Sequence, residues 1–211
     1  MPHLVLLGDS IFDNGAYTNG GPDVVSQVRQ MLLPGWTASL SAVDGAMTGD
    51  IPEQISGLPK EASHLVLSVG GNNALLEASV LGHAASSMAQ AVGVLADVAS
   101  KFEKDYRSAV AACLRPGLPL IVCSIYNGCF ADSQYQRLVS TALVVFNDAI
   151  LRVAIESRLS VVDLRFVCAN PEDYANPIEP SSVGGEKIAR AVVALVTGSN
   201  PNGPATRIVT V

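Results

Sequence analysis

Five short apolar segments alternate with stretches of helical character, and this alternation constrains the fold more than any other feature of the chain. Glycine, proline or polar residues bound the apolar segments, as is typical of β-strands; they are residues 3–7, 36–43, 65–69, 120–125 and 159–164. The stretches between and after them carry helical spacing or helix-boundary signals; they are residues 23–33, 51–58, 84–114, 135–158 and a last helix capped by Ser182. Strands that alternate with helices form a parallel sheet with helices on both faces. The sequence therefore predicts an α/β fold with a five-stranded parallel sheet.

The longest predicted helix, within residues 84–114, carries one continuous apolar stripe. Its members are spaced by four, three, three and four residues; they are Met88, Val92, Leu95, Val98 and Phe102. Residues at this spacing share one face of a helix. We expect that whole face to pack inward.

Length and composition favour one globular domain. The chain has 211 residues, of which 49% are hydrophobic and 15% charged, a composition that is wrong for a disordered protein. At roughly 150 residues per domain, one domain is the better fit. We expect it to span residues 1–197, with a glycine- and proline-containing tail at 198–211.

The charge balance argues against two classes of partner. A net charge of −6 disfavours nucleic acid and anionic membranes, which bind basic patches, but is compatible with a neutral or cationic small molecule. No apolar run approaches the roughly 20 residues of a membrane span, and the start lacks the basic region of a signal peptide. We expect a cytoplasmic protein whose four cysteines are reduced thiols. The sequence leaves the oligomeric state open.

Small polar loops follow four of the predicted strands. Ligands of such sheets bind at the carboxyl ends of the strands, where this chain has Ser10, residues 44–50, residues 70–73 and residues 126–129. Acyl transfer needs a nucleophile and hydrogen-bond donors for the developing oxyanion. Ser10 offers a hydroxyl and its own N–H, Gly49 a backbone N–H, and Asn72 a side-chain amide.

Three segments of the chain resemble conserved blocks of a known family. Residues 8–14 (Gly-Asp-Ser-Ile-Phe-Asp-Asn), 69–73 (Val-Gly-Gly-Asn-Asn) and 177–189 look like the first, third and last blocks of the SGNH, or GDSL, hydrolases. The resemblance spans residues 5 to about 196. It implies a flavodoxin-like three-layer α/β/α sandwich and hydrolysis of esters or thioesters, with Ser10 as nucleophile and Gly49 and Asn72 as oxyanion donors. Gly49 is preferred to Gly45 because residues 48–50 look like the second block.

The chain departs from the family where the base should lie. The aspartate and histidine of the last block correspond to Asn176 and Glu179, and the usual aspartate after the third-block asparagine is Asn73. His3 and His64 start strands that end at the catalytic edge, so at about 3.3 Å per residue each lies roughly 20 Å away. His83 follows the third strand and is expected at the surface.

Glu179 is therefore the candidate general base, with Asn176 to orient it; Asn73 and Asn176 are also expected to contact substrate. A free glutamate has a pKa of about 4.3 against about 6.5 for histidine, and burial can raise a carboxyl pKa by up to about 3–5 units. A Ser–Glu pair is thus possible if Glu179 is buried beside Ser10. Asp9 and Asp13 are expected to bind loop backbone.

We predict hydrolysis of carboxylic ester, thioester or O-acetyl bonds in a small-molecule acyl ester, through an acyl-enzyme on Ser10 and without metal or other cofactor. We expect the acyl pocket to involve residues 74–83 and 126–134, which include Leu75, Leu76, Leu81, Tyr126 and Phe130. The alternative is a non-catalytic ligand-binding module of the same fold with a solvated Glu179. A flavin- or nucleotide-binding protein is a third reading, although phosphate-binding motifs are absent.

Overall fold

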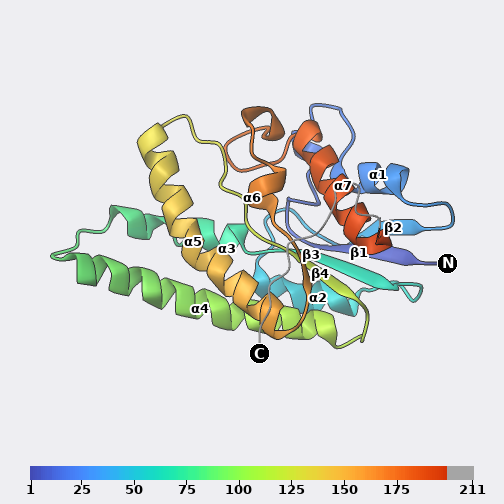
Figure 1. Ribbon diagram of the computed structural model, residues 1–211, viewed down its shortest axis with the longest axis horizontal. Helices are drawn as coiled ribbons and strands as arrows, with labels where there is room; N and C mark the ends of the chain where they lie inside the picture. Colours follow the sequence, from blue (N-terminus) through green and yellow to red (C-terminus); the bar gives the residue numbers. More distant parts are fainter. Residues whose placement is uncertain (199–211) are drawn as a thin grey trace.

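A five-stranded parallel sheet forms the centre of the molecule (Figure 1). The computed structural model describes residues 1–198. The strands lie in the order β2-β1-β3-β4-β5, and every neighbouring pair is parallel. Their bounds are β1 His3–Gly8, β2 Thr37–Leu40, β3 His64–Ser68, β4 Leu120–Cys123 and β5 Ser160–Val162. The predicted α/β class and strand number are confirmed.

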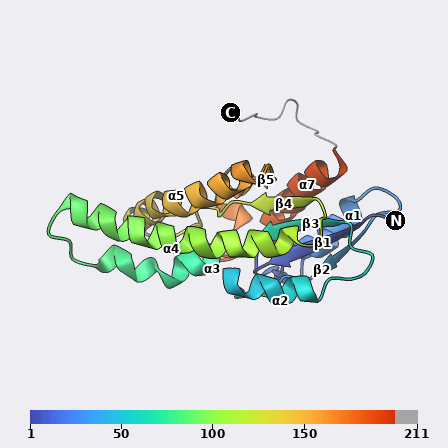
Figure 2. The same ribbon diagram turned by 90° about the horizontal axis from the view of Figure 1, so that it is seen from below.

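Helices cover both faces of this sheet (Figure 2). One layer contains α1 (Val24–Met31), α6 (Leu164–Val167) and α7 (Ser182–Thr197). The other contains α2 (Ile51–Ser56), α4 (Met88–Leu114) and α5 (Ser133–Glu156), and the short helix α3 (Gly71–Leu76) follows β3. The three-layer α/β/α sandwich is therefore confirmed.

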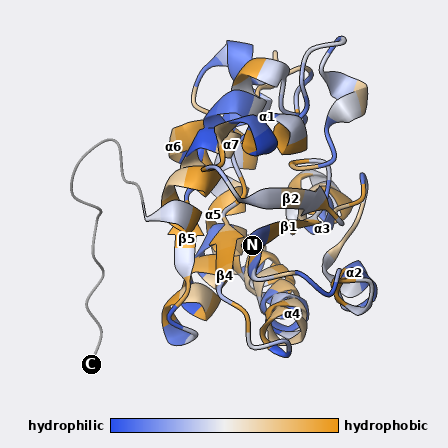
Figure 3. Ribbon diagram, turned by 90° about the vertical axis from the view of Figure 1, so that its right-hand side faces the viewer, coloured by the Kyte–Doolittle hydropathy of each residue, from blue (hydrophilic) through white to orange (hydrophobic). Residues whose placement is uncertain are grey.

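Each inner strand contributes to two separate cores. In β1, Leu4 and Leu6 pack toward α1 and α7, whereas Val5 and Leu7 pack toward α4 and α5. Successive side chains of a strand point to opposite faces, so a strand covered on both sides must be apolar at every position. This explains why β4, which is buried at all four residues, is hydrophobic throughout (Figure 3).

The long helix α4 extends beyond the edge of the sheet (Figures 1 and 2). The predicted inward stripe is correct for Val98 and Phe102, which are buried. It is wrong for Met88 and Val92, which are 80% and 59% exposed. The first turns of α4 lie past the strands, where no sheet lies beneath the helix to cover them.

Two further details differ from the sequence-based expectation. The cap of α7 is Ser181, whose hydroxyl oxygen accepts from the N–H groups of Val183 and Gly184. Ser182 instead donates its hydroxyl to the carbonyl of Pro22. The predicted tail at 198–211 lies outside the described residues apart from Gly198.

Helix α5 combines length with apolar composition. Within residues 1–198 it is the one helix that could cross a membrane by these criteria, which core helices of soluble proteins also meet. Its inner face, including Phe146, Ile150 and Val153, is buried in the core that it shares with α4. In this structure α5 is a core helix.

Candidate active site

Ser10 lies just past the carboxyl end of β1 in a tightly fixed turn. It is 6% exposed. Gly8 precedes it with φ of +124°, and a Cβ there would lie 1.7 Å from the carbonyl oxygen of Ser68, so the position requires glycine. The side chain of Gln54 in α2 binds both the N–H and the carbonyl of Gly8, each at 2.8 Å. Gln54 thus fixes the backbone that presents Ser10 through two hydrogen bonds.

The backbone of Glu179 is held within its own loop. Its N–H donates to the Asn176 Oδ1 at 3.0 Å, and its carbonyl accepts from the N–H of Ala175 at 2.9 Å. Asn176 is exposed, and its side-chain oxygen also accepts from the N–H of Ile178. Asn176 therefore contacts Glu179 through the main chain and not through the carboxylate, and its predicted orienting role stays a prediction.

Two side chains from other loops attach this segment to the sheet. The hydroxyl of Tyr126, in the loop after β4, donates to the carbonyl of Ile178 at 2.6 Å. The amide of Asn14, in the loop after β1, donates to the carbonyl of Pro180 at 3.2 Å. Asn14 is completely buried and also accepts from the N–H of Val24. The Ser10 loop and the Glu179 loop are thereby joined directly.

The carboxylate of Glu179 is buried against the Ser10 hydroxyl. Glu179 is 6% exposed, and its Oε2 has no hydrogen-bond partner within residues 1–198. Burial raises the pKa of Glu179, and the charge of Asp44 raises it further, whereas the neighbouring Ser10 side chain favours the ionised form and lowers it. The arrangement supplies the desolvated acceptor that a general base requires.

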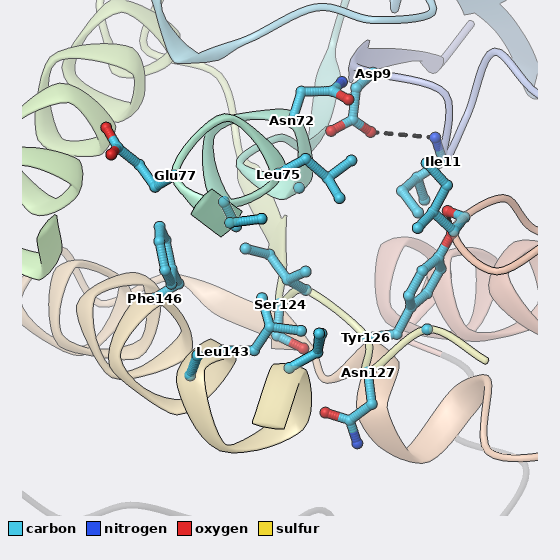
Figure 4. Close-up of a pocket in the computed structure, with 18 of the residues that line it drawn as sticks. Asp9, Ile11, Asn72, Leu75, Glu77, Ser124, Tyr126, Asn127, Leu143 and Phe146 are labelled. Carbon is cyan, nitrogen blue, oxygen red and sulfur yellow. Dashed lines mark hydrogen bonds between the residues drawn. The ribbon is translucent and has the colours of Figure 1, made fainter. Parts of the chain in front are cut away.

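A second carboxyl, that of Asp9, is buried beside the same site. Its Oδ1 accepts from the N–H of Ile11 at 3.1 Å, and its side chain lies next to Asn72 (Figure 4). Burial is the main cause that raises the pKa of Asp9 to about 7, and the nearby Glu179 contributes. The contact with loop backbone that the sequence predicts for Asp9 is therefore present. The one predicted for Asp13 is present too, since Asp13 accepts from the N–H of Asp44.

The predicted oxyanion donors occupy different positions. Asn72 lines the pocket, and its amide donates to the carbonyl of Ala46 at 3.0 Å. Gly49 is exposed in the 3₁₀ helix Thr48–Asp50 and does not contribute to the pocket lining found within residues 1–198. Asn73, expected to contact substrate, instead binds the N–H and the hydroxyl of Thr48. The two asparagines therefore hold the loop after β2 against α3.

The three histidines lie away from Ser10. The ring of His3 bonds the hydroxyls of Thr37 and Ser39, and His64 packs against Trp36. His83 is exposed at the end of the 3₁₀ helix Ala78–Gly82 and is not in the pocket lining. The elimination of histidine as the base agrees with these positions.

An apolar pocket opens beside Ser10, between α3, α4, α5 and the loop after β4 (Figure 4). The predicted lining is correct for Leu75, Leu81, Tyr126 and Phe130, but Leu76 is 66% exposed and lies outside it. Sequence reasoning missed the contribution of the two long helices; their lining residues are Leu95, Val98, Tyr135, Val139, Ala142, Leu143 and Phe146. Leu95 and Val98 belong to the stripe predicted to pack inward, and helical spacing alone does not distinguish a core position from a pocket position.

Comparison with protein families gives a match over most of the chain. The model of the GDSL-like Lipase/Acylhydrolase family matches residues 6–184. A comparison with curated protein sequences finds no significant match.

Solved structures with the same fold include several esterases and lipases. An extracellular lipase from Streptomyces rimosus superimposes with a TM-score of 0.68 at 15% identity, covering 95% of this chain and 100% of the lipase. A lipase/acylhydrolase from Enterococcus faecalis gives 0.63 at 19% identity, with 97% and 100% covered. A carbohydrate acetylesterase from Sinorhizobium meliloti gives 0.63 at 11% identity, with 94% and 99% covered. The family match over residues 6–184, together with the Gly-Asp-Ser turn after β1, shows that the chain belongs to the GDSL-like lipase/acylhydrolase family of ester-hydrolysing enzymes.

Proposed function

We propose that this chain hydrolyses carboxylic esters through an acyl-enzyme on Ser10, with Glu179 as the general base. The Ser10 hydroxyl oxygen attacks the ester carbonyl while its proton passes to Glu179. Collapse of the tetrahedral intermediate breaks the bond to the alcohol, which leaves with that proton. Water then attacks the acyl-enzyme and loses a proton to Glu179. The second tetrahedral intermediate breaks its bond to the Ser10 oxygen, which takes that proton back, and the carboxylic acid leaves.

The observation that carries this proposal is the buried, unpartnered carboxylate oxygen of Glu179 beside Ser10. A solvated glutamate is a weaker base than histidine by roughly two pKa units, or about 3 kcal/mol. Burial in this loop raises the pKa of Glu179 and so reduces that deficit. The hydrogen bonds from Asn14 and Tyr126 to the neighbouring carbonyls keep the carboxylate in place.

Donors for the oxyanion are available at the same edge of the sheet. We assign this role to the N–H of Ser10, which makes no hydrogen bond within residues 1–198, and to the second amide proton of Asn72. The N–H of Gly49 is a third candidate, on the loop that Asn72 and Asn73 hold against α3. A preorganised donor typically contributes about 10²–10³-fold to the rate.

The apolar pocket provides a site for the acyl chain. It encloses about 100 Å³, and since one water needs roughly 10–15 Å³ by the same measure, it has room for several carbon atoms. Among proteins of this fold are a lipase and a carbohydrate acetylesterase, whose names imply acyl groups of different size. The apolar lining here favours an acyl group longer than acetyl.

A fluorophosphonate probe, read by mass spectrometry, tests the nucleophile and the base together. We expect labelling of Ser10 in the wild-type protein, none in Ser10→Ala, and labelling slowed at least about 100-fold in Glu179→Gln. Glu61→Gln is the matched control, because it removes an equally charged, exposed side chain near the amino end of β3.

Labelling is the decisive readout because weak ester cleavage is not. Oxyanion donors alone can leave roughly 10³–10⁴-fold acceleration over water, so a slow reaction with activated esters does not prove a base. Absence of labelling at every pH between about 5 and 9 would overturn the proposal in favour of a non-catalytic binding module.

A further inference from the structure

Acidic side chains gather on the side of Ser10 opposite the acyl pocket. In the loops after β1 and β2, the Tyr17 hydroxyl donates to Asp44 Oδ2 at 2.6 Å, and the N–H of Asp44 donates to Asp13 Oδ2 at 2.9 Å. We call Asp13, Tyr17 and Asp44 the acidic rim. None of the three rim residues is in the pocket lining found within residues 1–198, which includes Asp9, Ser10 and Glu179 and otherwise comes largely from segments after β3 and β4. Strand β1, which ends before Ser10, lies between β2 and β3, so we place the rim on the β2 side of Ser10.

The carboxylates around Ser10 lack compensating cations. Within residues 1–198, Asp9, Asp13, Asp44 and Glu179 make no salt bridge, although acids elsewhere do, such as Asp163 with Arg165. The pocket lining found there contains no lysine or arginine. The charge of Asp44 raises the pKa of both Asp9 and Glu179, so the rim and the buried acids act on one another.

A second observation concerns a buried carboxylate in the pocket lining itself. Glu179 is only 6% exposed and lines the pocket, and its Oε2 has no hydrogen-bond partner within residues 1–198. A buried acceptor without a partner is costly unless a ligand or water binds it. Two buried acids, Asp9 and Glu179, therefore lie beside Ser10 in the lining of the apolar pocket, and the acidic rim is close enough to act on both.

We infer that the preferred substrates are esters of a cationic alcohol, one that carries a quaternary ammonium or a protonated amine. This inference rests on the proposed ester hydrolysis. The acyl chain occupies the apolar pocket, and the cationic end of the alcohol lies over the acidic rim, where Tyr17 adds an aromatic face. Alcohols or thiols that carry phosphate groups are disfavoured by like-charge repulsion.

A pair of isosteric esters measures this preference directly. Butyrylcholine and 3,3-dimethylbutyl butyrate share the acyl group and the shape of the alcohol but differ by one positive charge. An exposed ion pair contributes a factor of up to about five, so two rim carboxylates predict a cationic-to-neutral ratio of kcat/KM of about 5–10 at low salt. The ratio should fall toward one near 0.5 M salt, where the screening length is only a few ångströms.

Substitution of the rim locates the effect. Asp44→Asn and the double variant Asp13→Asn/Asp44→Asn keep side-chain oxygens that can accept the same hydrogen bonds, and each should lower the ratio by about 2–5-fold. Glu61→Gln, with the same change in charge far from the rim, should leave the ratio and the activity unchanged. The ratio is taken within each variant, so a general loss of activity does not mimic the effect.

The outcomes separate this inference from the proposed function. A wild-type ratio near one that does not change with salt would overturn the inference, while Ser10-dependent cleavage of the neutral ester would leave the hydrolase mechanism intact. A high ratio that survives the double variant would also overturn it, because the charge would then lie elsewhere. If the rim variants fail to fold, the salt dependence of the wild-type ratio decides. Absence of Ser10 labelling would instead refute the proposed function.

Discussion

Replacement of Asp9 by asparagine should increase the free energy of unfolding, relative to the wild type, more at pH 8 than at pH 5. Burial raises the pKa of Asp9 to about 7, whereas an unfolded chain has an aspartate pKa of about 3.9. Between these values the folded state holds more protons than the unfolded state, so stability falls as pH rises. Between pH 5 and pH 8 this linkage acts over about two pH units, up to the pKa of Asp9. At 1.36 kcal/mol per unit, the wild-type free energy of unfolding falls by about 2–3 kcal/mol.

Asparagine cannot ionise, and its Oδ1 can still accept from the N–H of Ile11. The free energy of unfolding of Asp9→Asn minus that of the wild type should therefore increase by about 2–3 kcal/mol between pH 5 and pH 8, equivalent to about 5–10 °C in Tm. Urea unfolding at four pH values measures it, with Glu61→Gln as an exposed control. A difference that is flat with pH within about 0.5 kcal/mol would refute the reasoning.

Two further substitutions test the scaffold and the pocket. Asn14→Ala removes both hydrogen bonds of a fully buried side chain; we expect a loss of about 2–4 kcal/mol in urea unfolding and a fall in kcat, and wild-type values of both would contradict the role of Asn14 in joining the two loops. Leu143→Phe narrows the apolar pocket; kcat/KM for octanoyl esters should fall at least about 10-fold relative to acetyl esters, and an unchanged ratio would show that acyl chains bind elsewhere.

The fold was readable from the sequence because local pattern and tertiary environment agree in the inner strands. Apolar runs such as residues 120–125 are buried on both faces, as a central parallel strand must be. Agreement ends where the helix α4 leaves the sheet. Met88 and Val92 continue the stripe of Val98, yet they are exposed because nothing in the sequence shows where the sheet stops.

The candidate site was only partly readable. Ser10 and Glu179 follow from the resemblance to family motifs and from the absence of a histidine near the edge of the sheet. Asn14 and Tyr126 were missed as positioning residues because their partners are backbone carbonyls more than 50 residues away in the chain. Asn73 binds the loop after β2, a contact that the sequence did not predict because a polar residue at a strand end can bind a neighbouring loop as well as a ligand. Its contact with substrate stays a prediction.

The pH dependence of kcat/KM for a p-nitrophenyl ester tests the role of Glu179 most directly. The wild-type protein should lose activity as pH falls through the pKa of Glu179, which burial places above that of a free glutamate. Asp9→Asn should retain this acidic limb, whereas Glu179→Gln should lose the limb together with about 10²–10⁴-fold of the rate. A Glu179→Gln protein within about threefold of the wild type, with its acidic limb intact, would contradict the assignment of Glu179 as the base.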